Sequence, residues 1–248
     1  MTWTDIIGFL IVLISAGLLA SLAYFHRKSP PTFRELSAFR LLRKAIGLSV
    51  EEGSRLHVSL GRGGVNTPQW ASALAGLATL LRIANLASAG DRPPVATCGD
   101  GALSILAQDT LQVSYQKTTS AGQFDSTNSR LTGLTPFSYV AGAIPIMHDE
   151  QISTSILIGN FGIEAGLMTD AAERQGSRCV AASDNLSAQA VLYASTQDPL
   201  IGEELYAAGA YTGAGIMHAV SLHVQDILRW LIVAVVLIGI LIKLTGLL

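Results

Sequence analysis

The chain has 248 residues, of which 50% are hydrophobic and 14% charged, and its formal net charge is −2. It is too apolar for an ordinary soluble domain and too charged to lie in a membrane along its whole length. The charge balance also argues against nucleic-acid binding, because phosphate recognition needs a concentrated basic face.

Two apolar runs account for the excess of hydrophobic residues. Residues 6–25 carry no charge, and a helix of that length crosses about 30 Å of hydrocarbon. Residues 231–248 form a second run, interrupted only by Lys243, whose long stem can carry its ammonium group to the head groups. The predicted organisation is a transmembrane segment, a soluble domain and a second transmembrane segment, at residues 1–28, 29–215 and 216–248.

The first run has a cleaved signal peptide as its alternative, since residues 21–23 resemble a cleavage site. We favour a retained span, because a signal peptide carries positive charge before its apolar run, whereas only Asp5 precedes this one. Lysine and arginine close to a span stay on the cytoplasmic side. We therefore expect a protein of the cell inner (cytoplasmic) membrane with a cytoplasmic domain and both termini outside. The basic residues after the run are Arg27, Lys28, Arg34, Arg40, Arg43 and Lys44.

The first half of the soluble domain alternates predicted strands and helices. An amphipathic helix over residues 33–46 either lies on the membrane or packs on the domain, and packing is favoured. A strand at 56–60 precedes a glycine turn and a helix at 70–86, which Thr67 is expected to cap. A strand at 95–98 then leads to a helix that Asp100 is expected to cap.

The most informative stretch is residues 155–184, which reads as strand, glycine turn, helix and strand. The helix is expected at 163–175, between strands at 156–158 and 179–182. Such βαβ units imply a parallel sheet buried on both faces. The pattern occurs at 56–113 and again at 156–195, by duplication or by coincidence. The fold class is therefore α/β, a Rossmann-like layered domain inserted between the two transmembrane helices.

The remaining segments carry weaker signals. Residues 117–135 are polar and are expected to form a loop, whereas 137–147 are apolar and, with Pro145, favour a short helix over a central strand. Small residues fill 207–215, which predicts close approach between helices or subunits. From Ile216 the pattern continues as one helix into the second span.

The glycine turns after the strands contain the best ligand candidates. Backbone N–H groups beside Arg62 suit an anion, although the spacing matches neither GxGxxG nor the Walker pattern, and glycine needed only for the turn is the alternative. Acidic residues at the strand ends are explained either as helix caps or as parts of one polar pocket. The candidate ligand-binding residues are Gly61, Arg62, Gly63, Gly64, Asp100, Gly159, Asn160, Glu164 and Asp184.

Other reactive side chains give no catalytic or metal motif. His148, Asp149 and Glu150 are consecutive, so they point in different directions and read as a solvated turn. His218 and His223 are five residues apart, which is not the helical spacing of a shared metal. No serine lies in a GxSxG elbow. The sequence therefore supports neither an enzyme nor a particular cofactor.

Four stretches carry a resemblance to a known family: ILIGNFGIEAGLMTDAAERQG, VAASDNLSAQAVLYA, IGEELYAAGAY and QDILRWL, all in the C-terminal half. They resemble a bacterial family of two-span membrane proteins with a Rossmann-like soluble domain, known only as a domain of unknown function. The resemblance implies no catalytic residues. Our first hypothesis is a structural or scaffold component of a homo-oligomeric membrane assembly, and the second is a membrane-tethered sensor of a nucleotide or other small anionic ligand.

Overall fold

The computed structural model describes residues 3–27, 33–88, 90, 92–116 and 125–244. The chain forms two compact units. The end unit combines both termini, Met1–Phe33 and Gly215–Leu248, and the central unit is Arg34–Ala214.

The end unit contains α1 (Trp3–Phe25) and α9 (Ile216–Leu244), which pack against each other. Both helices are long and apolar enough to cross a membrane, and their apolar side chains are exposed along most of their length. The imidazole of His26 stacks on that of His223, with 5.9 Å between ring centroids. One helix of the central unit, α3 (Trp70–Ala87), meets the same criteria of length and hydropathy, but 44% of it is buried inside the protein.

The central unit is built on a five-stranded sheet in the order β3-β2-β1-β4-β5, and every neighbouring pair is parallel. The β1, β2 and β4 strands are almost wholly buried, which explains their apolar sequences. The strands are β1 (Arg55–Gly61), β2 (Val95–Cys98), β3 (Ser129–Leu131), β4 (Ile152–Asn160) and β5 (Arg178–Ser183).

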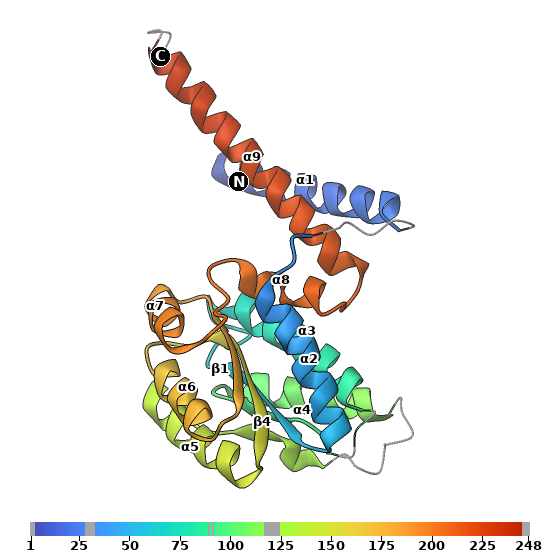
Figure 1. Cartoon of the computed structure of the whole chain (residues 1–248). Coiled ribbons are helices and arrows are strands. Elements are labelled where there is room, and N and C mark those ends of the chain that lie inside the picture. The colour runs from blue at the N-terminus through green and yellow to red at the C-terminus, as the bar shows by residue number, and fades with distance from the viewer. Residues whose placement is uncertain (1–2, 28–32, 89, 91, 117–124, 245–248) are drawn as a thin grey trace. The chain divides into compact units, whose positions relative to one another are not determined.

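Helices cover both faces of this sheet (Figure 1). One core lies beneath α2, α3, α4 and α8, and the other beneath α5, α6 and α7. The α/β class with a parallel sheet, predicted from the sequence, is thus confirmed. Besides α3, the helices are α2 (Ser37–Glu52), α4 (Gly101–Gln116), α5 (Pro136–Asp149), α6 (Ala165–Arg174), α7 (Leu186–Ser195) and α8 (Glu204–Tyr211).

The amphipathic helix expected near residue 40 packs on the domain. The side chains of Phe39, Leu42 and Ile46 on α2 are buried in the core with β1, whereas Arg40 and Lys44 are exposed. Packing, the favoured alternative, is therefore confirmed.

The strand β3 was not expected, because its residues fall in the polar stretch read as a loop. It has only three residues, none of them buried, and it pairs with β2 at the sheet edge. An edge strand of this kind needs no apolar run, so sequence periodicity does not reveal it. Residues 117–124 of the expected loop lie outside the described part of the chain.

The small residues at 207–211 pack within their own chain. They form α8, in which Ala207, Ala208 and Gly209 are buried, and α8 lies against α3. The close approach that these residues permit is therefore made inside the central unit, so they give no argument for a subunit interface. Helix α9 begins at Ile216 as expected, after a break at Gly213 and Gly215, whose φ angles are +77° and +140°.

The two ends of the central unit lie side by side. The hydroxyl of Tyr211 donates a hydrogen bond to the Arg34 carbonyl oxygen at 2.6 Å. Arg43 donates to the Tyr211 carbonyl oxygen at 3.1 Å, and Arg82 to that of Thr212 at 2.7 Å. The two arginine bonds satisfy the Tyr211 and Thr212 carbonyl groups at the C-terminal end of α8.

One part of the expected solvated turn is not solvated. His148 and Asp149 are exposed at the end of α5, but Glu150 forms ion pairs with Arg55 and Arg130, and its side chain is only 18% exposed. Burial disfavours its charged form, yet hydrogen bonds and charges from both arginines outweigh that effect and lower the pKa of Glu150. The sequence around Glu150 does not reveal these ion pairs, because Arg55 and Arg130 are distant from it in the sequence.

We expect Glu150→Gln to lower the free energy of unfolding by about 2–3 kcal/mol, because it leaves two partly buried guanidinium groups without their counter-charge. Urea denaturation of the full chain in a non-ionic detergent measures this loss. Asp149→Asn is the matched control: its carboxylate is 77% exposed, so its effect should stay within about 0.5 kcal/mol. Equal losses in the two variants would contradict the prediction.

Candidate functional site

The candidate ligand residues gather at the carboxyl edge of the sheet, where the strand order reverses between β1 and β4. Ligands of open parallel sheets bind at such a reversal point. The turn after β1 lies directly against the turn after β4: the backbone N–H of Arg62 donates to the Asn160 carbonyl oxygen at 2.9 Å. A Cβ atom added to Gly63 would lie 3.2 Å from the Cβ of Asn160.

Two of the glycines are required by this close approach of β1 and β4. Gly61 has a φ of +70°, and a Cβ atom there would lie 2.2 Å from the Asn160 carbonyl oxygen. A Cβ atom on Gly159 would lie 2.0 Å from the Leu60 carbonyl oxygen. For Gly61 and Gly159 the structural explanation, glycine needed for the turn and for strand contact, is therefore sufficient.

Arg62 and Glu164 form an ion pair at the centre of the edge. Their Nε and Oε1 atoms are 3.3 Å apart, and the same Oε1 accepts a hydrogen bond from the Gly162 N–H at 2.9 Å. Glu164 is 3% exposed, while the Arg62 side chain is 25% exposed. The Arg62 Nη1 and Nη2 groups have no hydrogen-bond partner among the described residues. Glu164 thus occupies an anion position and leaves part of the guanidinium available.

The two aspartates at the strand ends have different partners. Asp100 Oδ1 accepts from the Leu103 N–H at 2.9 Å and caps α4, as expected. Asp184 was expected to cap α7, but Asn185 does so, and Asp184 instead accepts from the Asn160 side-chain amide at 2.7 Å. Both positions follow a strand closely, so sequence alone does not show which of two adjacent polar residues makes the cap.

The expected cap of α3 is also corrected. Thr67 was expected to cap this helix, but α3 begins at Trp70, preceded by Gln69. The Thr67 hydroxyl accepts from the Gly64 N–H at 3.1 Å and donates to the Gly64 carbonyl oxygen at 2.8 Å. Thr67 therefore closes the glycine turn. A Cβ atom on Gly64 would lie 3.1 Å from Asp100 Oδ2, which links this turn to the end of β2.

The nine candidate residues are thus connected around one edge, and the chemistry that they offer is polar recognition. Among the described residues there is no group of three or more His, Cys, Asp or Glu side chains that could hold a metal ion. The carboxylates of Asp100, Glu164 and Asp184 each have a donor of their own. Arg62 has donors left for a ligand at this edge.

A buried polar cluster next to the edge was not found from the sequence. His57 Nε2 lies 2.9 Å from Thr97 Oγ1, which lies 3.0 Å from the Tyr139 hydroxyl, and that hydroxyl lies 2.5 Å from Ser59 Oγ. All four side chains are fully buried. The Tyr139 ring also reaches the edge, since a Cβ atom on Gly99 would lie 3.1 Å from it. Alternating polar residues within the apolar strand β1 were the available signal.

Burial sets the charge state of this cluster. It lowers the pKa of His57 from 6.5 to about 4 and raises the pKa of Tyr139, so both groups are neutral at pH 7. The Nδ1 atom of His57 has no partner among the described residues, and neither has Ser155 Oγ, which lies on the paired strand β4. The cluster is therefore a neutral hydrogen-bonded layer beneath the edge.

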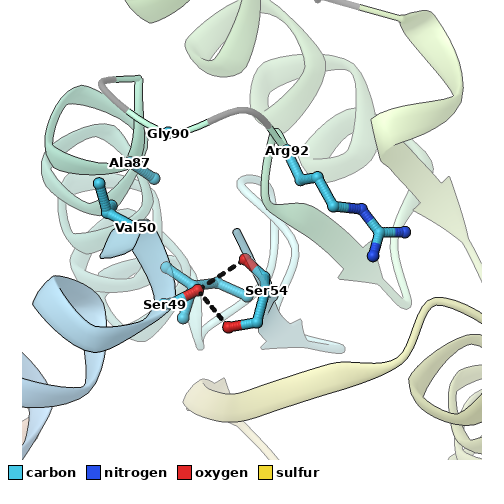
Figure 2. A pocket seen from close by; sticks show the side chains of 7 residues that line it. Ser49, Val50, Ser54, Ala87, Gly90 and Arg92 are labelled. Carbon is cyan, nitrogen blue, oxygen red and sulfur yellow. Dashed lines mark hydrogen bonds between the residues drawn. The ribbon is translucent and has the colours of Figure 1, made fainter. Parts of the chain in front are cut away.

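A shallow pocket lies at the opposite, amino end of β1 (Figure 2). Its volume is about 200 Å³, part of which is open solvent. This volume is smaller than the roughly 300 Å³ of the smallest usual ligand sites. The Ser49 hydroxyl donates to the Ser54 carbonyl oxygen at 2.7 Å across one wall. None of the candidate ligand residues lines it. The lining residues are Ser49, Val50, Ser54, Leu56, Ala87, Gly90 and Arg92.

Comparison with known proteins gives one match. The model of a family described as "Domain of unknown function (DUF6754)" matches residues 2–247. No curated protein and no solved structure matches the chain.

Proposed function

Because the chain belongs to the DUF6754 family, a domain of unknown function, over residues 2–247, we propose its function from the geometry of the central unit. It is a membrane-tethered sensor that binds a small anionic ligand, such as a nucleotide or phosphate ester, at the carboxyl edge of the sheet. The strand order supports a Rossmann-like fold, because β3-β2-β1-β4-β5 is the order of the first five strands of the doubly wound nucleotide-binding fold.

The observation that carries this proposal is the state of Arg62. Its guanidinium lies where the strand order reverses, is partly exposed, and has two amino groups without partners among the described residues. A guanidinium presents these donors in a planar fork that matches the oxygens of a phosphate or carboxylate. The anion would therefore bind to Arg62 from the solvent side.

Glu164 has a defined part in this function. Its carboxylate already holds the Arg62 Nε group and the Gly162 N–H, as a ligand oxygen would. An incoming anion either shares the guanidinium with Glu164 or displaces it, and in both cases the two negative charges repel each other. Glu164 thus weakens ligand binding.

The end unit supplies the tether. We place α1 and α9 across a bacterial inner membrane, because both are uncharged or nearly so over the required length and expose their apolar side chains. Basic residues after the first span support a cytoplasmic central unit with both termini outside.

A scaffold role in a homo-oligomeric assembly is the second proposal. The small residues that first suggested it pack inside the central unit. The observation that still favours it is the set of large apolar side chains exposed on the central unit, which a second copy would cover.

The sensor proposal predicts that a ligand raises the melting temperature of the full chain in detergent. A panel of nucleotides, inorganic phosphate and small phosphate esters is tested, and a ligand at 100 times its Kd should add about 2.7 kcal/mol of stability. Arg62→Ala should abolish the shift. Glu164→Gln should strengthen binding about fivefold, because removing one close like charge is worth roughly 1 kcal/mol.

Arg178→Ala is the matched control for the loss of a positive charge. Arg178 is exposed at the amino end of β5, away from the candidate residues, so this variant should keep the full shift. A panel without any stabilising ligand, or a shift that survives in Arg62→Ala, would exclude an anion site at this position.

A further inference from the structure

Large apolar side chains stand exposed around the same carboxyl edge. Leu134, Phe137, Ile163 and Leu186 are between 59% and 80% exposed. Each follows the carboxyl end of a strand, at or next to the start of α5, α6 or α7. A scattered apolar residue on a surface is ordinary, but several around one polar centre mark an interaction surface.

Backbone contacts place these side chains on either side of Arg62. A Cβ atom on Gly99 would lie 2.5 Å from Arg62 Cγ and 3.1 Å from the Gly133 carbonyl oxygen, so Arg62 lies close to the residue before Leu134. On the other side, Arg62 pairs with Glu164, the residue after Ile163. The edge therefore presents a guanidinium between apolar side chains from different helices.

The chain enters the central unit at this same end. Leu200 pairs in parallel with Ala182 near the carboxyl end of β5, and four residues later Glu204 binds Arg34 at 3.2 Å. Arg34 follows the membrane-length helix α1, which ends at Phe25. Eight residues of chain, 26–33, therefore separate the end of a membrane-length helix from Arg34 at this edge.

Charges at the edge suit a phospholipid head group. Arg62 offers donors for a phosphate, and Asp100 and Asp184 are partly exposed carboxylates beside it. A zwitterionic head group brings a phosphate group for Arg62 and an ammonium group that these carboxylates attract. Exposed apolar side chains that flank such a site bury themselves among the upper acyl carbons.

We infer that the carboxyl edge of the central unit docks on the bilayer surface, where Arg62 takes the phosphate group of a phospholipid head group. This inference rests on the proposed anion site and names the source of its ligand as a lipid of the membrane that holds the protein. The apolar side chains around Arg62 supply the docking surface, and Asp100 and Asp184 face the amine of the head group.

The test measures lipid proximity in the full chain, with one copy in each lipid nanodisc of phosphatidylethanolamine and phosphatidylcholine. Phe137→Cys and Leu186→Cys are labelled with an environment-sensitive fluorophore, and nitroxide-bearing phospholipids are added as quenchers. Fluorescence at both positions should fall about twofold or more. Gln175→Cys, exposed at the far end of α6, is the control and should not change. Unsubstituted protein is the background for labelling: burial raises the thiol pKa of Cys98 and Cys179 to about 12 and so slows their reaction, and any label taken up by the partly buried Cys179 is subtracted.

Arg62→Ala in the labelled proteins should reverse most of the quenching, which ties docking to the head-group phosphate. Absent quenching in single-copy nanodiscs overturns the inference. If the labels are then shielded only in vesicles with many copies, a second copy of the chain covers the edge instead. The anion site itself is judged separately: a free phosphate ester that stabilises the detergent-solubilised protein through Arg62 leaves the proposed function standing even when docking fails.

Discussion

The Gly61→Ala variant is expected to have a free energy of unfolding about 3 kcal/mol below that of the wild type. Two costs add. Gly61 has a φ of +70°, where an alanine costs about 1–2 kcal/mol, and the new methyl group would lie 2.2 Å from the Asn160 carbonyl oxygen. Because that oxygen belongs to the backbone of the neighbouring central strand, β1 and β4 must move apart, which adds about 1–3 kcal/mol.

Gly53→Ala carries only the first cost, so its comparison with Gly61→Ala isolates the cost of the strand contact. Gly53 ends α2 with a φ of +63°, and nothing lies within 4 Å of its added Cβ atom. This variant should therefore lose only the conformational term, about 1 kcal/mol. Urea titration with pulse proteolysis in a non-ionic detergent gives both values. Equal losses at the two positions would show that the strand contact contributes nothing.

The central unit should also lose stability in mild acid through His57. Its pKa is about 4 in the folded protein against an ordinary 6.5, so between these values the unfolded chain binds the proton more readily. Stability is therefore fully present above pH 6.5 and falls as the pH is lowered towards 4. From pH 7 to pH 4.5 the expected loss is about 2–3 kcal/mol.

His57→Gln separates this effect from other titrations. Glu150, whose pKa is lowered in the folded protein, also loses stabilisation as the pH falls below its ordinary value of 4.5. The variant keeps that contribution but not the histidine titration, so its stability should vary less between pH 7 and pH 5. Should the variant fold poorly, hydrogen exchange at the imidazole C2 position of the wild type reports the His57 pKa directly. A pKa near 6.5 would refute the prediction.

Much of the fold was predictable because local rules and burial agree in most of the chain. The strands β1, β2, β4 and β5 are apolar runs that end in turns, and such runs are typical of a parallel sheet. Likewise, Pro145 correctly excluded a central strand at α5. The edge strand β3 was not predicted, since three residues that pair on one side only need no hydrophobic pattern.

The candidate site was predictable as a set of positions but not as a set of partners. Because carboxyl ends of parallel strands meet at one edge, Asp100, Glu164 and Asp184 were expected either as helix caps or as parts of one polar pocket. The structure pairs Arg62 with Glu164 and Asn160 with Asp184, and Asp100 caps α4. Which carboxylate pairs with Arg62 depends on side-chain directions set by packing. The buried layer around His57 on β1 depends in turn on Tyr139 from α5, and no local sequence pattern indicates this contact.

The hydrogen bond between Tyr211 and Arg34 has a consequence for how this architecture arises. A domain whose first and last residues adjoin can be inserted into, or removed from, the connection between two helices without stretching either. Residues 34–214 therefore have the form of a cassette inserted between two helices. The same property makes the cassette exchangeable: a different domain with adjoining ends, spliced between α1 and α9, should leave both membrane-length helices intact.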